Sequence, residues 1–232
     1  MPSQPRSPTR APLSALFWSA HDITALRSTA EGWRDDPFPV RDALRNLVNN
    51  AAALEGIARR SSVHANGFAK IVLLKGKRSS IRLHVWHRSN GRWVPDTMPH
   101  GHRWEFASWI LTGELRETTF REAAGGARYE RLAYRRLPNG RYALDPDGDA
   151  PLRPDRSYIR TAGTVYTRDR SVLHTATPHG HGLVASLVLQ GPRRFDPTPV
   201  YRRPGVPHDH REWRVSADKV QELVSEVEAA IR

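Results

Sequence analysis

Hydrophobic residues recur at two different spacings along the chain, and the spacing changes near residue 65. Before that point they fall three and four positions apart, which is the spacing of one helix face. The clearest set is Leu44, Leu47, Val48, Ala51 and Leu54. The pattern predicts two helices, over residues 13–27 and 40–59, separated by Pro37 and Pro39.

From residue 65 to about residue 190 the apolar residues come in short runs, bounded by Gly, Pro, Asn and Asp. Short runs rich in β-branched and aromatic side chains predict strands. We predict strands over 68–74, 81–87, 104–112, 115–120, 128–135, 142–144, 158–160, 164–166, 172–176 and 183–189. A series of short strands with no helix between them indicates an all-β sandwich or barrel.

Helical spacing returns at the end of the chain. Ser216 is the expected N-cap, and Asp218 lies in the first turn. One face then carries Val220, Leu223, Val224, Val227 and Ile231. The predicted organisation is a disordered tail over 1–12, a helical extension over 13–63, a β-barrel over 64–200, and a linker and helix over 201–232.

Composition excludes several classes of protein. The chain of 232 residues can bury a core of its own, and no apolar run approaches the ~20 residues that cross a bilayer. The Pro- and Arg-rich N-terminus lacks the apolar stretch of a signal peptide, so we expect a cytoplasmic protein. Cysteine is absent, which excludes disulfides, a thiolate nucleophile and a cysteine zinc site.

Net charge is +12 and the isoelectric point is about 10.9. Lysine occurs only at 70, 75, 77 and 219, so nearly all of the positive charge is arginine. A basic surface can bind nucleic acid, but these arginines are scattered and no predicted helix carries a basic stripe. We therefore expect a small anionic molecule, rather than nucleic acid or a membrane, as the partner.

Three histidines form a candidate metal site. His100 and His102 lie two residues apart, which in extended backbone places both imidazoles on one side. His174 ends a predicted strand further along and can supply the third ligand. Three protein ligands leave positions open for substrate or dioxygen, as catalysis requires. A chance pair remains the alternative, because the chain has 11 histidines.

The same residues resemble the cupin superfamily, and within it the cysteine-dioxygenase group of three-histidine thiol dioxygenases. The pair His100 and His102, followed by a strand that ends at Gly113, resembles the first cupin motif. His174 and the segment 184–192 resemble the second motif, and the likeness covers roughly residues 65–195. It implies an all-β core, the cupin β-barrel (a double-stranded β-helix or jelly roll) with N-terminal helices and a C-terminal helix. The implied cofactor is Fe(II), with Zn, Ni or Mn as other divalent candidates.

The sequence departs from the thiol dioxygenases in two informative ways. Their metal-adjacent cysteine falls here on Phe106 or Ala107, and their Ser-x-His-x-Tyr run falls on 186–190, where only the serine is kept. The resemblance therefore does not extend to cysteine as the substrate.

One face of the 81–87 strand carries Arg82, His84 and Trp86. Either this face is exposed to solvent or it lines the mouth of the barrel. In the second case the arginine can bind a carboxylate bidentately, and the tryptophan can form a pocket wall. These residues are candidates for substrate binding.

Further candidates come from the resemblance. It places Lys70 where thiol dioxygenases hold the arginine that binds the substrate carboxylate, with Ser186 and Gln190 as neutral hydrogen-bonding groups in the same pocket. Glu105 has three open roles: a fourth metal ligand, an acid/base or outer-shell group, or a surface residue. A second His-x-His pair, His179 and His181, is expected to lie in a Gly-rich loop and is the alternative candidate for the metal site.

The function expected from these features is that of a mononuclear non-heme iron oxygenase or dioxygenase. Its substrate would be a small, carboxylate-bearing, amino-acid-like or specialised metabolite. Two alternatives stay open: a redox-neutral, metal-dependent cupin isomerase or rearrangement enzyme, and a non-catalytic cupin that binds a ligand or metal. The terminal helices either cover sheet edges or form a homodimer contact.

Overall fold

The structure is a computed structural model that describes residues 22–64, 66–87, 98–137, 142–193, 197–206 and 213–231. Its helices are α1 (Ile23–Asp35), α2 (Phe38–Val48), α3 (Ala51–Ala58) and α4 (Ala217–Ala230). Its strands are β1 (Ser62–Val63), β2 (Ala69–Lys75), β3 (Ser80–Trp86), β4 (Phe106–Thr112), β5 (Glu114–Arg136), β6 (Tyr142–Thr161), β7 (Val165–Arg168), β8 (Leu173–His179), β9 (Val184–Gln190), β10 (Thr198–Arg202) and β11 (Trp213–Arg214). No helix in these ranges is long and apolar enough to cross a membrane.

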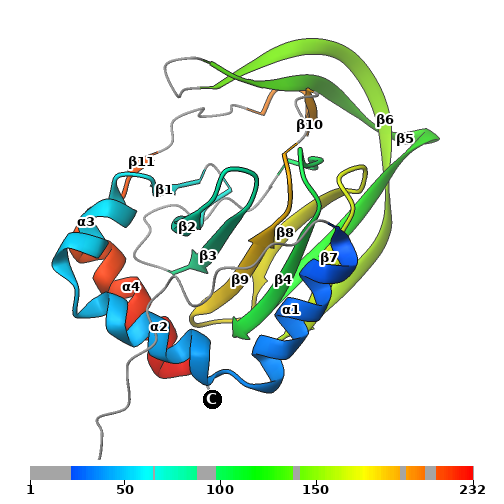
Figure 1. The fold of residues 1–232 in the computed structure, drawn as a ribbon. Helices are drawn as coiled ribbons and strands as arrows, with labels where there is room; N and C mark the ends of the chain where they lie inside the picture. Colours follow the sequence, from blue (N-terminus) through cyan, green and yellow to red (C-terminus); the bar gives the residue numbers. More distant parts are fainter. Residues whose placement is uncertain are drawn as a thin grey trace, which may run out of the picture.

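Two antiparallel sheets make up the body of the protein (Figure 1). The first has the strand order β11-β1-β2-β3-β9-β4-β7. In the second, β5 pairs with β6 along one edge, and with β8 and then β10 along the other. Strands that are distant in sequence thus lie side by side, as in β3 and β9. The predicted fold, an all-β core of the double-stranded β-helix type with flanking helices, is confirmed.

The outer face of the first sheet is covered by helices. In Figure 1, α1 lies along β4 and β7, and α4 packs between α2 and α3. Ile81, Leu83 and Val85 of β3 belong to the core that these helices share with the sheet. All seven residues of β9 are buried, since its other face also meets packed side chains. A strand covered on both faces is expected to be apolar throughout, and β9 largely is.

The turn between β4 and β5 depends on Gly113. Its φ is +72°, in the left-handed region that favours glycine. A Cβ built there would lie 2.5 Å from the carbonyl oxygen of Leu183, so even a strained alanine would clash with backbone. This glycine ends the strand that follows the His-x-His pair, where the sequence predicted a turn.

Both predictions for the N-terminal helices need correction. The segment predicted as one helix over 40–59 is two helices, because the side chain of Asn50 accepts a hydrogen bond from the backbone N–H of Ala53 and begins α3. The helix predicted over 13–27 instead begins at Ile23 after its N-cap Asp22, and runs on to Asp35. Residues 13–21, like the predicted tail, lie outside the described residues.

The strands predicted over 115–120 and 128–135 are one strand, β5, and those over 142–144 and 158–160 are one strand, β6. Breaks in register between these two strands absorb the intervening glycines and prolines as β-bulges. Pro146, Pro151 and Pro154 are tolerated because β6 is the last strand in the order β10-β5-β6, and an edge strand can lack N–H donors. Together β5 and β6 form a long hairpin that arches over one end of the barrel (Figure 1).

Candidate metal centre

The three predicted ligands come from two segments that backbone hydrogen bonds join. The N–H of His100 donates to the carbonyl of His174 at 3.1 Å, and the N–H of His174 donates back at 3.0 Å. His102 follows two residues later, just before β4 begins. The main chain therefore sets the spacing of the two segments before any metal is present.

The three imidazoles converge. Their ring centroids are 5.0 to 5.2 Å apart, and one ligand nitrogen from each lies within 4.8 Å of the other two. The Nε2 atoms of His102 and His174 are 2.8 Å apart. Two nitrogens that bind one ion at right angles, each at about 2.1 Å, would be about 3 Å apart. The donor set thus fits a single divalent metal.

Hydrogen bonds to the other ring nitrogen orient two of these ligands. Nδ1 of His100 lies 2.9 Å from the carbonyl oxygen of Met98, and Nδ1 of His174 lies 3.0 Å from Oε1 of Glu117. Because each Nδ1 donates to an oxygen, each Nε2 is left with a lone pair for a metal. The tautomers that metal binding needs are therefore built into the protein.

Glu117 contacts a candidate metal ligand, and the sequence did not predict this contact. Its side chain is fully buried on β5 and receives hydrogen bonds from His174 and from two arginines. Arg168 donates at 2.5 and 2.6 Å, and Arg160 donates at 2.9 and 3.1 Å. Burial raises the pKa of Glu117, but hydrogen bonding and charge from His174 and Arg168 outweigh it and hold the pKa below its ordinary value. The carboxylate stays ionised and fixes His174 in place.

Two of the candidate ligands, His100 and His102, are held neutral. Burial is the largest cause, and the neighbouring His174 adds to it, lowering the pKa of His100 to about 4 against the smaller opposite effect of its hydrogen bond to Met98. Burial, followed by the charge of His100, lowers the pKa of His102 well below its ordinary value. Neutral imidazole is the form that ligates a metal, so no proton has to leave at neutral pH.

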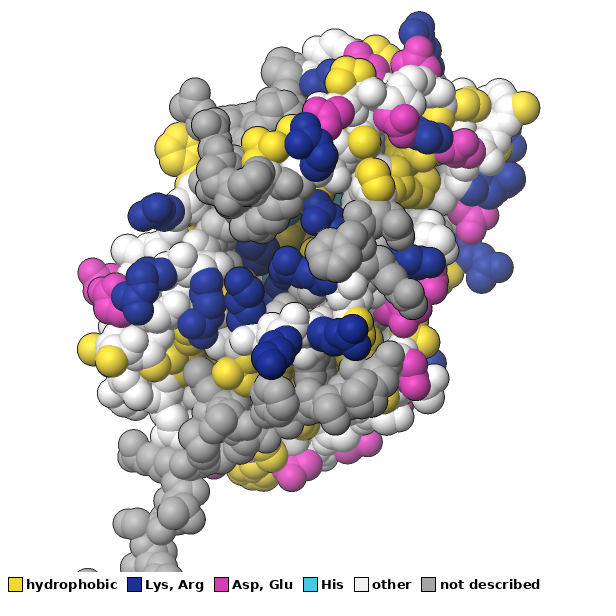
Figure 2. Space-filling model, turned by 45° about the horizontal axis from the view of Figure 1, so that its top comes forward, with side chains coloured by type: hydrophobic (Ala, Val, Ile, Leu, Met, Phe, Trp, Pro, Cys, Tyr) yellow, Lys and Arg dark blue, Asp and Glu magenta, His cyan; other side chains and the backbone are white. Residues whose placement is uncertain are grey.

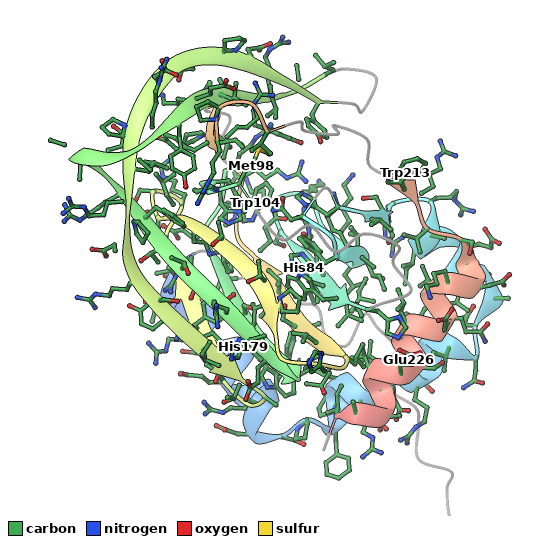
Figure 3. All side chains as sticks on the ribbon, turned by 180° about the vertical axis from the view of Figure 1, so that it is seen from behind. His84, Met98, Trp104, His179, Trp213 and Glu226 are labelled. Atoms are coloured by element: carbon green, nitrogen blue, oxygen red, sulfur yellow. The ribbon has the colours of Figure 1, made fainter. Side chains whose placement is uncertain are left out.

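The cluster opens into a cavity of about 210 Å³ that all three histidines line. Of the predicted substrate-binding residues, Lys70, Arg82, His84, Trp86 and Ser186 also line it. The face of β3 that could have been solvent-exposed therefore faces the cavity. Figure 3 shows Met98 and Trp104 between the barrel strands and the long hairpin, with His84 further down on β3.

Gln190 and Glu105 are not among the residues that line the cavity. Gln190 is buried, and its side-chain oxygen accepts a hydrogen bond from the Ser80 hydroxyl at 2.9 Å. Glu105 precedes β4, and it is Phe106 that turns its side chain into the cavity. Glu105 is also outside the group of three candidate ligands, and its role stays a prediction. The acid that touches a ligand histidine is Glu117.

The second His-x-His pair, His179 and His181, does not belong to a group of three candidate ligands among the described residues. His179 is the last residue of β8 rather than a loop residue, and its Nδ1 lies 3.1 Å from the guanidinium of Arg116. Within the described ranges, His100, His102 and His174 are the one group of three or more candidate ligands.

The cavity is strongly basic. Four cations line it (Lys70, Arg82, Arg103 and Arg193), and no Asp or Glu does so among the described residues. Figure 2 shows Lys and Arg side chains gathered around a hollow in this face of the molecule. Two buried nitrogens, Nε2 of His84 and Nε1 of Trp86, have no hydrogen-bond partner within the part of the chain that the structure describes. A buried polar atom without a partner is costly, so both atoms are suited to a ligand.

No family model matches the sequence, and no curated protein does either. Among solved structures, the chain is similar to hydroxypropylphosphonic acid epoxidase from S. wedmorenis, at 12% identity over 54% of this chain and 51% of that one, with a TM-score of 0.35. An uncharacterised double-stranded β-helix protein from Klebsiella pneumoniae gives 11% identity, coverages of 63% and 95%, and a TM-score of 0.35. Hydroquinone 1,2-dioxygenase from Sphingomonas sp. TTNP3 gives 9% identity, coverages of 54% and 66%, and a TM-score of 0.32.

The chain spans about half the length of the epoxidase structures that it matches. At these identities and TM-scores the likenesses are no guide to the chemistry. The strand order and the three grouped histidines agree with the fold and the ligand positions that the sequence predicted. Membership of the cysteine-dioxygenase group stays a prediction.

Proposed function

We propose that the protein is a mononuclear non-heme iron oxygenase, acting on a small molecule that carries a carboxylate. The observation that carries this proposal is the convergence of three imidazole nitrogens at the wall of a basic cavity. Three imidazoles with no carboxylate among them leave the double positive charge of the metal uncancelled. Such a centre favours an anionic ligand and keeps positions open for it.

A ferrous ion in this site would supply the chemistry with dioxygen that side chains alone cannot perform. In a dioxygenase reaction both atoms of dioxygen enter the product, so the electrons come from the substrate and no separate reductant is needed. Zn, Ni or Mn would fit the same three nitrogens, and Fe(II) is the metal that matches the proposed reaction.

The residues of the chain have separable roles in this proposal. Glu117 and the Met98 carbonyl orient two ligands, as their hydrogen bonds to Nδ1 indicate. Lys70 and Arg82 attract the carboxylate and align it, since both are cations on the cavity wall. The buried rings of Phe68 and Phe106 exclude bulk water from the reacting atoms.

A second candidate function rests on His84. Burial, followed by the charges of Arg82 and Lys70, lowers the pKa of this histidine well below its ordinary value. The ring is therefore neutral at pH 7, and its partnerless Nε2 can take up or deliver a proton at a substrate carbon. This arrangement would serve a redox-neutral isomerase in which the metal only polarises the substrate.

The test begins with elemental analysis of protein purified without added metal. Fe(II) is then restored without air, and oxygen uptake is measured over a panel of small carboxylates. We expect iron to bind at one per chain, and a subset of the panel to stimulate uptake. Conversion of a substrate in the absence of oxygen would favour the isomerase, and metal binding with no turnover at all would favour a non-catalytic cupin.

Two variants decide whether the three histidines are responsible. His174→Ala is expected to lose both the metal and the oxygen uptake. His181→Ala is the matched control, because His181 is an exposed histidine of the nearby loop. Retention of iron and of full uptake by His174→Ala would rule the proposal out.

A further inference from the structure

The β5–β6 hairpin covers one end of the cavity, and contacts with neighbouring strands hold it in place. The outer half of β5 pairs with β10, from Thr198 opposite Tyr134 to Arg202 opposite Glu130. A small core of its own, Tyr129, Ala150, Leu152, Leu173 and Tyr201, packs within the hairpin region. The hairpin is therefore a fixed wall of the cavity that can contribute to ligand selection.

Tyr134 and Tyr142 are the aromatic side chains that this hairpin presents to the cavity, beside Leu144. Both line the cavity, and they stack on each other with ring centroids 5.1 Å apart and planes 26° apart. The guanidinium of Arg103 lies 4.6 Å from the centroid of the Tyr134 ring. This contact holds a cation and an aromatic face next to each other at the upper end of the cavity.

A second pairing of arginine with an aromatic ring lies on the cavity wall. The guanidiniums of Arg82 and Arg193 lie 5.0 and 5.5 Å from the centroid of the Trp104 ring. Flexible arginines that rest on rings lose less freedom when they bind an anion, because they are already positioned. The wall thus offers cations and flat aromatic surfaces together.

The lining as a whole favours a planar group. Seven Phe, Trp and Tyr residues line the cavity: Phe68, Trp86, Trp104, Phe106, Tyr134, Tyr142 and Tyr166. Offset-stacked and edge-to-face contacts give a ring an advantage over a saturated group of equal size, about two- to tenfold in affinity. An aliphatic acid would satisfy the cations but would gain none of these contacts.

The size of the cavity agrees with such a ligand. A cavity of about 150 Å³ accommodates benzene. The volume here is about 210 Å³, so there is room for one such ring with a carboxylate and small substituents.

We propose that the cavity binds a single-ring aromatic acid, with its ring beneath the Tyr134–Tyr142 pair and its carboxylate held by the arginines that rest on Trp104 and Tyr134. This inference rests on the proposed function, because it names the substrate class of the same site. It also assigns Tyr134 and Tyr142, on a hairpin remote from the histidines in sequence, as specificity-determining residues.

The experiment is calorimetric titration of the zinc-loaded protein with four probes: benzoate, cyclohexanecarboxylate, benzyl alcohol and inorganic phosphate. We expect benzoate to bind about fivefold tighter than cyclohexanecarboxylate, which has the same charge but no flat ring. Benzyl alcohol, which lacks the charge, is expected to bind at least about tenfold more weakly than benzoate. Equal affinity for the two carboxylates, or tighter binding of phosphate, overturns the inference.

Variants of the β5–β6 hairpin test whether this surface is responsible for the preference. Tyr134→Ala is expected to erase the preference for benzoate, whereas Tyr134→Phe keeps the ring and should keep the preference. Arg128→Ala is the control for the hairpin, because this exposed residue pairs with Asp149 and does not line the cavity. A preference for benzoate that survives in Tyr134→Ala also overturns the inference.

The zinc content of the same samples separates this inference from the proposed function. Protein that binds zinc and, with iron, consumes oxygen, yet shows no preference for a ring, disproves the ligand class and leaves the oxygenase standing. Protein that prefers benzoate but holds no metal at His100, His102 and His174 disproves the oxygenase and leaves the ligand class standing.

Discussion

The two walls of the barrel treat their buried polar groups in opposite ways. On the β5–β8 wall, Glu117 is fully buried and receives hydrogen bonds from His174, Arg160 and Arg168. On the β3 wall, Nε2 of His84 and Nε1 of Trp86 are buried without partners among the described residues. The first wall satisfies its own hydrogen bonds and holds the candidate ligands in position. The second wall has buried polar atoms that a bound molecule would satisfy.

The comparison indicates which substitutions should change the stability of the fold and which should change ligand binding. A buried ionic network is strongly destabilised when one partner is removed, because the remaining charges cannot reach water. A buried donor with no partner already carries its penalty, so its removal costs the fold little. Substitutions on the β5–β8 wall should therefore lower stability, whereas substitutions on the β3 wall should mainly lower ligand affinity.

The largest effect is expected from Glu117→Ala. Its loss leaves the guanidiniums of Arg160 and Arg168 without their shared acceptor, which should lower the free energy of unfolding by about 3–5 kcal/mol. Glu130→Ala is the control, because Glu130 forms a comparable short ion pair with Arg202 that is partly exposed, and should cost less than about 1 kcal/mol. Urea denaturation measures both, and equal losses would refute the contrast between buried and exposed pairs.

Glu117→Gln should act on the metal. The amide keeps the size of the side chain but loses the charge that holds Nδ1 of His174, so metal affinity should fall about 10- to 100-fold. Glu122→Gln is the matched control on the same strand, where Glu122 accepts a hydrogen bond from the Tyr201 hydroxyl. Competition with a chromogenic chelator gives both affinities, and similar values for the two variants would contradict the role of Glu117.

Acid should destabilise the metal-free protein through His100. Burial and the nearby His174 lower its pKa to about 4, below the value of 6.5 that the unfolded chain has. A depressed pKa contributes stability that is present above pH 6.5 and is lost as pH falls toward 4. Between pH 7 and pH 5 the loss from this residue is about 2 kcal/mol, measured as a shift in the denaturation midpoint. The loss should be smaller in His100→Gln, and an unchanged dependence on pH would exclude His100 as its source.

The smallest effect is expected from Trp86→Phe. The indole N–H has no partner within the described ranges, so the free energy of unfolding should stay within about 1 kcal/mol of the wild-type value. The affinity of the zinc-loaded protein for benzoate should nevertheless fall, because a donor is lost from the cavity. A large loss of stability with unchanged binding would reverse the assignment of this wall.

The sequence was sufficient to predict the fold and the grouping of the three histidines. A His-x-His pair before a strand and a Gly turn is a local signal. The alternation placed Arg82, His84 and Trp86 on one face but left open whether that face is exposed, and in the structure these residues line the cavity. Glu117 could not be found in this way, because its contact with His174 depends on the register between β5 and β8 across 57 residues. A weak signal did exist, since Glu117 alternates with Leu115 and Thr119, which are both buried.

Two other features were hard to predict for one physical reason. The alternation of side chains that sequence patterns rely on holds only within a regular strand. Glu105 lies just before β4, so strand parity could not decide between its three roles. The bulges between β5 and β6 likewise interrupt the pattern, and the long hairpin was read as four short strands.

The reciprocal backbone hydrogen bonds between His100 and His174 have a consequence for the order of events in folding. Two segments more than seventy positions apart must be joined before the nitrogens can meet, so the metal site cannot exist until the barrel has closed. Contacts between such distant segments form slowly. A metal that binds only the closed barrel should leave the rate of folding almost unchanged and lower the rate of unfolding. It would therefore stabilise the folded protein kinetically.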